Sequence, residues 1–303
     1  MPPPDAAATP ELVLDPAATV LAPAAETTVA LRRRGLGVGA WLSIVWLVAI
    51  VLAAVLAPVL PLPDPLQSSV ELKNAGPSLD HLLGGDGLGH DVLAQVVWGG
   101  RTSLVVGFGA ILFGTLTGGF LGLVSGYYRG RLESVLVGAF DVMLAFPQLV
   151  LALAIVAFLG NSARNVIAAL AIVSTPILAR ITRANTLTWS QREFVLAART
   201  LGARNPRIMV REVLPNVLPA MLSIALLGVA VVIVAEGGLS LLGVGVQSVH
   251  GSWGVLIATA RNDLDEAPWA VFGPSGAIFL TVLALNYLGD VVRSRFDVRG
   301  SAL

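Results

Sequence analysis

The chain has 303 residues and a formal net charge of zero, and 13% of its residues are charged while 55% are hydrophobic. Soluble domains carry about 25% charged residues, so this balance, with a mean hydropathy of +0.81, indicates an integral membrane protein. The absence of cysteine excludes a disulfide framework, a thiolate metal site and a cysteine nucleophile, and the neutral charge shows no basic excess of the kind that binds nucleic acid.

Residues 1–34 are rich in proline and alanine and carry only scattered acids before three arginines, Arg32–Arg34. This composition predicts a disordered tail. The apolar run that follows starts too late and is too long for the hydrophobic region of a cleaved signal peptide. We therefore expect a first membrane helix that stays in the mature protein.

Six segments of the chain are long and apolar enough to cross a membrane, which takes about 20 residues. They cover residues 40–60, 103–126, 134–159, 166–181, 217–235 and 272–292. Pro147 and Pro176 are expected to kink the third and fourth helices because each removes a backbone hydrogen bond. Asp91 is expected to cap a short external helix, 92–98, just before the second span.

The distribution of positive charge orients these spans. With the N-terminus inside, fifteen of the 19 Lys and Arg residues fall on the inner side and four on the outer side. Cytoplasmic loops carry such an excess. Both termini are therefore predicted to be cytoplasmic, with residues 35–100 forming the first membrane helix and an external segment.

The segment 191–216, between the fourth and fifth spans, is rich in arginine and is predicted to lie along the cytoplasmic face. Its pattern indicates a helix over 191–201, a turn at Gly202, and a second helix for which Asn205-Pro206 supply the cap and first position. A solvated basic loop would explain the arginines, but not the small pair Ala197-Ala198 or the glycine break. A partner protein on this side is therefore the sharper hypothesis.

The residues of this segment resemble the cytoplasmic coupling motif of ABC importer permeases. The matching positions are Glu193, Ala197, Ala198, Gly202, Ile208, Leu214, Pro215 and Asn216. Over residues 35–298 the chain resembles the dipeptide/oligopeptide/nickel branch, specifically its C-type permease subunit. Further matches lie at 81–104, 140–153, 239–245 and 286–293. The chain departs from the family at Glu212, where His is frequent, and at His90, where Arg is frequent.

This resemblance implies an all-α integral membrane protein with six transmembrane helices and the type I ABC importer permease fold. Residues 101–293 would form the permease domain, with coupling helices at 191–216 and a cytoplasmic tail at 294–303. The implied partners are a homologous second permease, cytoplasmic ATPase subunits that bind ATP and Mg, an extracytoplasmic substrate-binding protein and lipid. The chain itself would lie in the bacterial plasma membrane, bind no cofactor or nucleic acid, and have no catalytic site. It carries no phosphate-binding loop.

Three further residues are candidates for gating or for the transport pathway: Asp141, Pro147 and Glu236. Ionisable residues at membrane depth are costly and count as functional candidates. A hydrogen-bonded structural role is the preferred interpretation for both acids, although the resemblance raises Glu236, because an acid commonly precedes the segment 239–245 in this family.

The predicted function is an ATP-driven importer subunit for dipeptides or oligopeptides. The same machinery could import nickel or another small solute, and His81, His90 and His250 all fall outside, but they lack the spacing of metal ligands. A stand-alone secondary transporter is a second alternative, against which the spans show little buried charge. An intramembrane enzyme is a third, and the spans show no catalytic constellation.

Overall fold

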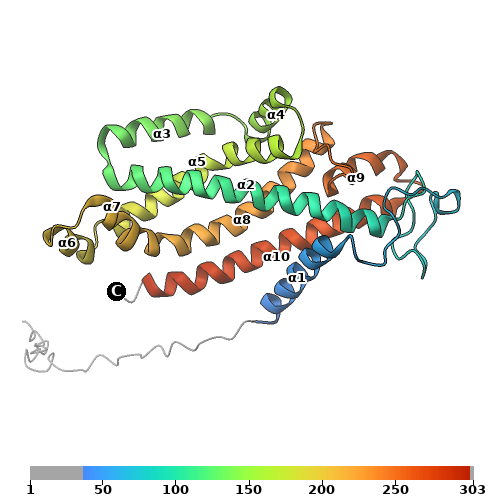
Figure 1. Cartoon of the computed structure of the whole chain (residues 1–303), viewed down its shortest axis with the longest axis horizontal. Helices are drawn as coiled ribbons and strands as arrows, with labels where there is room; N and C mark the ends of the chain where they lie inside the picture. The colour runs from blue at the N-terminus through green and yellow to red at the C-terminus, as the bar shows by residue number, and fades with distance from the viewer. Residues whose placement is uncertain (1–36, 301–303) are drawn as a thin grey trace, which may run out of the picture. The chain divides into compact units, whose positions relative to one another are not determined.

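The computed structural model describes the backbone of residues 37–300 and the side chains of residues 37–294, and all regular elements in this range are helical. Figure 1 shows four long helices, α2, α5, α8 and α10, running side by side. The α-helices are α1 (Val38–Leu56), α2 (Val92–Tyr128), α3 (Gly130–Leu144), α4 (Gln148–Leu159), α5 (Ala163–Trp189), α6 (Glu193–Thr200), α7 (Asn205–Ile208), α8 (Leu214–Leu241), α9 (Trp253–Ala260) and α10 (Pro268–Gly300). The expected tail, 1–34, lies outside the described residues.

Membrane-spanning helices account for most of the described chain. Five are long and apolar enough to cross a membrane: Val38–Leu56, Val92–Tyr128, Ala163–Trp189, Asn205–Leu241 and Pro268–Ser294. The pair α3 and α4 passes the same test together but is bent by 89° at its break, which makes up to six spans. The prediction of an all-helical, multi-pass membrane protein is confirmed.

Several boundaries differ from the sequence-based expectations. The expected separate helix at 92–98 is wrong, because α2 runs unbroken for 37 residues. The third span is not one kinked helix, since Pro147 is the N-terminal cap of α4 and separates it from α3. Pro176, in contrast, lies inside a continuous α5, which extends to Trp189 rather than ending near 181. Residues 294–300 continue α10 as helix.

The most extensive helix contact joins α2 to α5 and is built on glycine. Four glycines recur at every fourth position of α2: Gly114, Gly118, Gly122 and Gly126. A Cβ atom on Gly118 would lie 2.6 Å from the carbonyl oxygen of Thr175, and one on Gly126 would lie 2.8 Å from the carbonyl oxygen of Arg183. Small residues at this spacing allow two membrane helices to approach backbone to backbone. We call this contact the glycine seam.

Trp253, at the start of α9, is the largest side chain that is fully buried. Its indole Nε1 donates to the carbonyl oxygen of Val96 at 2.8 Å, and its backbone N–H donates to Ser103 Oγ at 3.0 Å. A Cβ on Gly100 would lie 2.9 Å from the Trp253 ring. Gly100 is therefore a packing position for α9 within the continuous helix α2.

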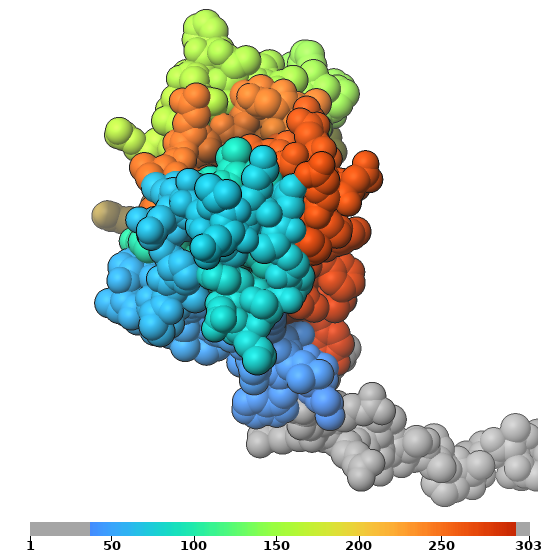
Figure 2. Space-filling model, turned by 90° about the vertical axis from the view of Figure 1, so that its right-hand side faces the viewer, coloured from blue at the N-terminus to red at the C-terminus, as the bar shows by residue number. Residues whose placement is uncertain are grey.

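The segment between α1 and α2, residues 57–91, folds over one end of the bundle beside residues 242–267 (Figure 2). Asp91 caps α2 as predicted, accepting from the backbone N–H of Ala94 at 2.7 Å, and it also pairs with His81. Burial alone would raise the pKa of Asp86, but hydrogen bonds from the backbone and side chain of His90 and from Gln95 hold that pKa below its ordinary value. The segment is thus internally ordered.

Candidate functional site

A short helical hairpin, α6 and α7, lies at the end of the bundle opposite α9 (Figure 1). Helix α6 ends in a Schellman motif: Gly202 has φ +79°, its N–H donates to the carbonyl oxygen of Arg199, and the N–H of Ala203 donates to that of Ala198. The predicted turn at Gly202 is therefore present, and it is exposed to solvent.

The second half of the hairpin differs from the expectation of a separate capped helix. Asn205 does not cap α7, because its side-chain oxygen accepts from the Tyr127 hydroxyl at 3.0 Å. After α7 the chain passes through one π-helical turn, Met209–Val213, directly into α8. The hairpin is thus continuous with a membrane helix, and any displacement of α7 acts directly on α8.

A separate apolar cluster anchors the hairpin to the bundle. Its buried members come from α2, α6, α7, the π-helical turn and α8: Leu123, Tyr127, Val195, Ile208, Met209, Val213, Val217 and Met221. The guanidinium of Arg199 also lies over the Tyr127 ring, 5.2 Å from its centroid. The hairpin is therefore packed on α2 and α8.

The eight residues of the coupling motif fall into two groups. Glu193, Ala197, Gly202 and Pro215 are exposed. Ile208 is fully buried, while Ala198 and Leu214 pack against the anchoring cluster and Asn216 donates to the carbonyl oxygen of Glu212 at 2.6 Å. The first group is available to a partner, and the second holds the hairpin in place.

The coupling motif does not include all of the exposed apolar residues in and around the hairpin. Leu201, next to the turn, is 88% exposed, and Leu196 and Val210 are also exposed. The pattern that could have identified Leu201 is its place directly before the left-handed glycine, where a helix ends and an apolar side chain has no neighbouring turn to cover it.

Glu236 lies at the other end of the bundle, near the end of α8, and only 1% of it is exposed. Its Oε1 accepts from Ser252 Oγ at 2.7 Å and from Ser240 Oγ at 2.9 Å. Ser252 is also the N-cap of α9. The acid therefore ties the start of α9 to α8, which agrees with the hydrogen-bonded role preferred for it from the sequence.

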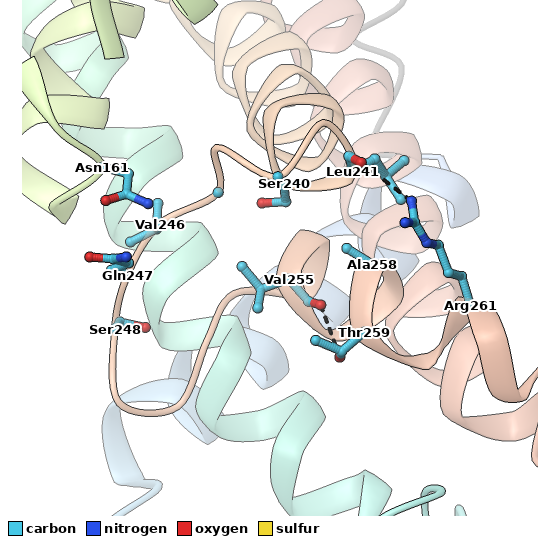
Figure 3. Close-up of a pocket in the computed structure, with 12 residues that line it drawn as sticks. Asn161, Ser240, Leu241, Val246, Gln247, Ser248, Val255, Ala258, Thr259 and Arg261 are labelled. Atoms are coloured by element: carbon cyan, nitrogen blue, oxygen red, sulfur yellow. Dashed lines mark hydrogen bonds between the residues drawn. The ribbon is translucent and has the colours of Figure 1, made fainter. Parts of the chain in front are cut away.

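An open pocket of about 440 Å³ lies beside this acid, between the end of α8, α9 and the loop that joins them (Figure 3). In Figure 3, Asn161 and Gln247 lie together on one wall, joined by a backbone hydrogen bond of 2.9 Å, while Arg261 reaches toward the carbonyl oxygen of Leu241 on the other. Its lining mixes apolar side chains, such as Leu241, Val246 and Val255, with polar ones, and Arg261 is the single charged residue among them.

Asp141 and Pro147 lie near the break between α3 and α4. Asp141 forms an ion pair with Arg180 of α5, and a second pair joins Glu133 of α3 to Arg183 of α5. Helix α3 makes few other contacts, and Phe140 is its single buried residue. The structure therefore places Asp141 in an ion pair on an open surface.

Each of the three histidines has its own neighbour. His81 pairs with Asp91, His90 pairs with Asp86, and the His250 ring lies on Trp98 with the ring centroids 4.2 Å apart. Within residues 37–294 no group of three or more His, Cys, Asp or Glu side chains is gathered as for a metal ion.

Curated relatives match most of this chain. A dipeptide transport system permease protein of Alkalihalophilus pseudofirmus is 38% identical over 263 residues, which cover 84% of this chain and 85% of that protein. A glutathione transport system permease protein of Pectobacterium atrosepticum is 40% identical over 224 residues, 74% of each chain. A putative peptide transport system permease protein of Brucella suis is 37% identical over 269 residues, 89% of each chain.

A solved structure and a family model agree with these relatives. A chain of the MetNI methionine ABC transporter in an inward-facing conformation matches with a TM-score of 0.56 at 18% identity, over 67% of this chain and 95% of that chain. The fold is therefore that of an ABC transporter permease. The model of the binding-protein-dependent transport system inner membrane component matches residues 118–299. The chain belongs to this family of multi-pass inner-membrane permeases.

Proposed function

We propose that this chain is one permease subunit of an ATP-driven importer that moves small peptides into the cell. Membership of the family supports the role as a permease. The relatives named for dipeptide, glutathione and peptide transport support a peptide as substrate, since glutathione is itself a tripeptide. The substrate would be delivered by an extracytoplasmic binding protein, and a homologous second permease would complete the pathway.

The hairpin of α6 and α7 is the proposed docking site for a cytoplasmic ATPase subunit. The observation that carries this assignment is the contrast between its two sides: Leu201 is 88% exposed, whereas Val195 and Ile208 are fully buried against α2 and α8. An apolar side chain presented beyond the membrane helices suits a groove on a soluble partner. ATP and Mg would be bound by the ATPase subunits, and this chain would contribute no catalytic residue or cofactor of its own.

The end that carries the hairpin is proposed to be cytoplasmic. It holds Arg192, Arg199, Arg204, Arg207 and Arg211 within twenty residues of sequence, as the positive-inside rule requires of a cytoplasmic loop. With six spans, both termini lie on this side, and the segment 57–91 and the pocket beside α9 face the exterior. The permease domain proper would then be residues 101–293.

Individual residues take different parts in this proposal. Glu193, Ala197 and Gly202, which are exposed, would contact the ATPase directly. Ile208 and Leu214 would act through packing, by fixing the hairpin to the ends of α2 and α8. Closure of the ATPase pair would then push on the hairpin and tilt the spans between inward- and outward-open states.

Gly202→Asp in the reconstituted transporter tests the docking site. The substitution adds bulk and charge at the exposed turn, so we expect ATP hydrolysis to continue while transport falls. Gly202→Asn is the matched control, because asparagine has nearly the same shape and also tolerates a positive φ, and it should have the smaller effect. Normal transport by Gly202→Asp would show that the hairpin is not the docking site.

The substrate is tested separately, by uptake of labelled dipeptides and of glutathione into proteoliposomes that contain the complete transporter and its binding protein. ATP-dependent accumulation of a peptide is expected. If ATP hydrolysis is coupled through the hairpin but no peptide accumulates, the peptide assignment is wrong while the docking assignment stands.

A further inference from the structure

Two ion pairs connect α3 to α5, and they differ in exposure. The Glu133 and Arg183 side chains are 19% and 30% exposed, whereas those of Asp141 and Arg180 are 52% and 49% exposed. The first pair is partly enclosed between the helices. The second lies on an open surface of the chain, and its depth in the membrane decides what that surface faces.

The ends of the helices give a scale for that depth. Helix α2 ends at Tyr128, α3 begins at Gly130 and α5 ends at Trp189, all at the hairpin end of the bundle. Tyrosine and tryptophan concentrate at membrane interfaces, so these ends mark one boundary of the hydrocarbon.

The exposed pair lies inside the hydrocarbon on this scale, with Arg180 between the inner boundary and the middle of the bilayer. Asp141 lies eleven residues after the start of α3, and Arg180 lies nine residues before the end of α5. At 1.5 Å per residue Asp141 is about 17 Å from the start of α3, while Arg180, which lies level with Gly122 of α2, is about 9 Å from Tyr128, in a hydrocarbon core about 30 Å thick. The hydroxyls of Thr117, which is exposed, and Thr175, which is half-buried, are 2.9 Å apart and lie deeper than Arg180 on α2 and α5.

Lipid is the wrong environment for such a surface. Ionised side chains within membrane spans face a water-filled cavity or the interior of a helix bundle, where they pair with one another. Asp141 and Arg180 pair with one another but remain half-exposed, and α3 is covered by little of this chain. In the assembled transporter this surface therefore faces a water-filled cavity or the interior of a larger helix bundle.

We infer that Asp141 and Arg180 line the translocation pathway and form a charged subsite for the two ends of a zwitterionic peptide. The inference rests on the proposed function and names the contact that the pathway makes with its substrate. The guanidinium of Arg180 receives the terminal carboxylate, with which it can form two parallel hydrogen bonds, and the carboxylate of Asp141 receives the terminal ammonium.

The ion pair between Asp141 and Arg180 can open in favour of the two charges of a bound peptide. When the peptide enters, each side chain leaves its partner for the opposite charge on the substrate, so neither charge is left uncompensated within the membrane. An extended dipeptide spans about 7 Å at most, so α3 and α5 need only a small separation to admit it. Helix α3 has few contacts to lose in such a movement.

Cysteine labelling tests whether the pair faces water. The natural chain has no cysteine, so single substitutions can be introduced without further changes to it. Gly138→Cys lies one turn before Asp141, where a Cβ meets no atom within 4 Å, and Ile177→Cys lies one turn before Arg180 at an exposed position. Leu52→Cys, on the equally exposed face of α1, is the control.

The complete transporter, with partner subunits made free of cysteine, is placed in lipid nanodiscs and treated with a charged methanethiosulfonate reagent. Gly138→Cys and Ile177→Cys should react, and Leu52→Cys should not. If neither pathway position reacts, or if Leu52→Cys reacts as fast, the assignment of this surface to the pathway is overturned.

Protection against the same reagent tests the subsite without the binding protein. Alanyl-alanine at about twice its dissociation constant should slow labelling of Ile177→Cys about threefold by mass action. N-acetyl-alanyl-alanine amide, which has neither terminal charge, should leave the rate unchanged. Arg180→Gln in the same background should abolish protection by alanyl-alanine, while Ile177→Cys still reacts with the reagent in the absence of peptide.

These outcomes separate the subsite from the proposed function. Equal protection by the two compounds, no protection by either, or protection that survives Arg180→Gln would each overturn the charged subsite. Failure of the complete transporter to accumulate any peptide would overturn the proposed function, whatever the labelling shows.

Discussion

Gly118→Ala is the sharpest test of how the membrane helices pack. A Cβ at this position would lie 2.6 Å from the carbonyl oxygen of Thr175 and 3.1 Å from both the backbone nitrogen of Ala179 and the Cβ of Leu178. Two of these three atoms belong to the backbone of α5, so no change of side-chain rotamer can relieve the contact. The two helices must move apart.

The size of this movement sets the expected cost. Restoring an ordinary separation of about 3.5 Å requires α2 and α5 to part by about 1 Å, and a gap of that size already removes up to about half of the dispersion energy at neighbouring contacts. Inserting one carbon into a tightly packed core costs about 1–3 kcal/mol. We expect Gly118→Ala to lower the free energy of unfolding by this amount.

The measurement is unfolding of the purified chain by denaturant in mild detergent, alongside Gly276→Ala. A Cβ on Gly276 in α10 meets no atom within 4 Å, so this control should be neutral or should stabilise by up to about 1 kcal/mol, because alanine favours a helix over glycine. If Gly118→Ala is as stable as the parent chain while the control behaves as stated, the glycine seam is not a close contact.

Three further predictions follow from single interactions. Trp253→Phe removes the indole donor from the Val96 carbonyl (2.8 Å) and should lower stability in the same unfolding assay by about 1 kcal/mol. Tyr127→Phe removes the hydrogen bond to Asn205 and should raise hydrogen–deuterium exchange in α6 and α7 without changing that of α9. Asp86 has a lowered pKa, so its stabilising contribution should be present above its unfolded pKa of about 3.9 and should disappear as the pH falls through and below that value. Asp86→Asn should remove this acid-dependent loss of melting temperature, and an unchanged pH profile would contradict the pairing.

The sequence predicted the class of protein and the hairpin well, because both depend on local signals. Long apolar runs separated by arginine-rich segments predict membrane helices, and a small pair followed by Gly202 predicts a helix that stops at a left-handed residue. The order of motifs along the chain then identified the family. The side that each helix presents to its neighbours was not predictable in this way, since an apolar stretch has the same composition whether it contacts lipid, another helix or a partner subunit.

The role of Asn205 shows how a tertiary contact overrides a local signal. Asn205-Pro206 has the composition of a helix start, but the hydroxyl of Tyr127, 78 residues earlier in the chain, donates to the side-chain oxygen that a cap would use.

The third span shows the reverse case, in which the effect of a local signal was underestimated. Pro147 was expected to kink a helix, yet the chain turns by 89° there, because α3 is held by ion pairs to α5 while α4 packs on α5 and α8.

Glycine accounts for one omission, and the membrane environment explains it. In water a glycine inside a helix is a weak point, and the glycines of α2 were not identified from the sequence as packing positions. A segment that spans a membrane stays helical despite its glycines, because unpaired backbone N–H and C=O groups are too costly in hydrocarbon. The lack of a side chain then matters mainly because it leaves room for a neighbour. The Trp253 ring lies against Gly100, and the backbone of α5 lies against α2 along Gly114 to Gly126. Within an apolar segment, glycines at every fourth position should therefore be interpreted first as the place where a second helix lies.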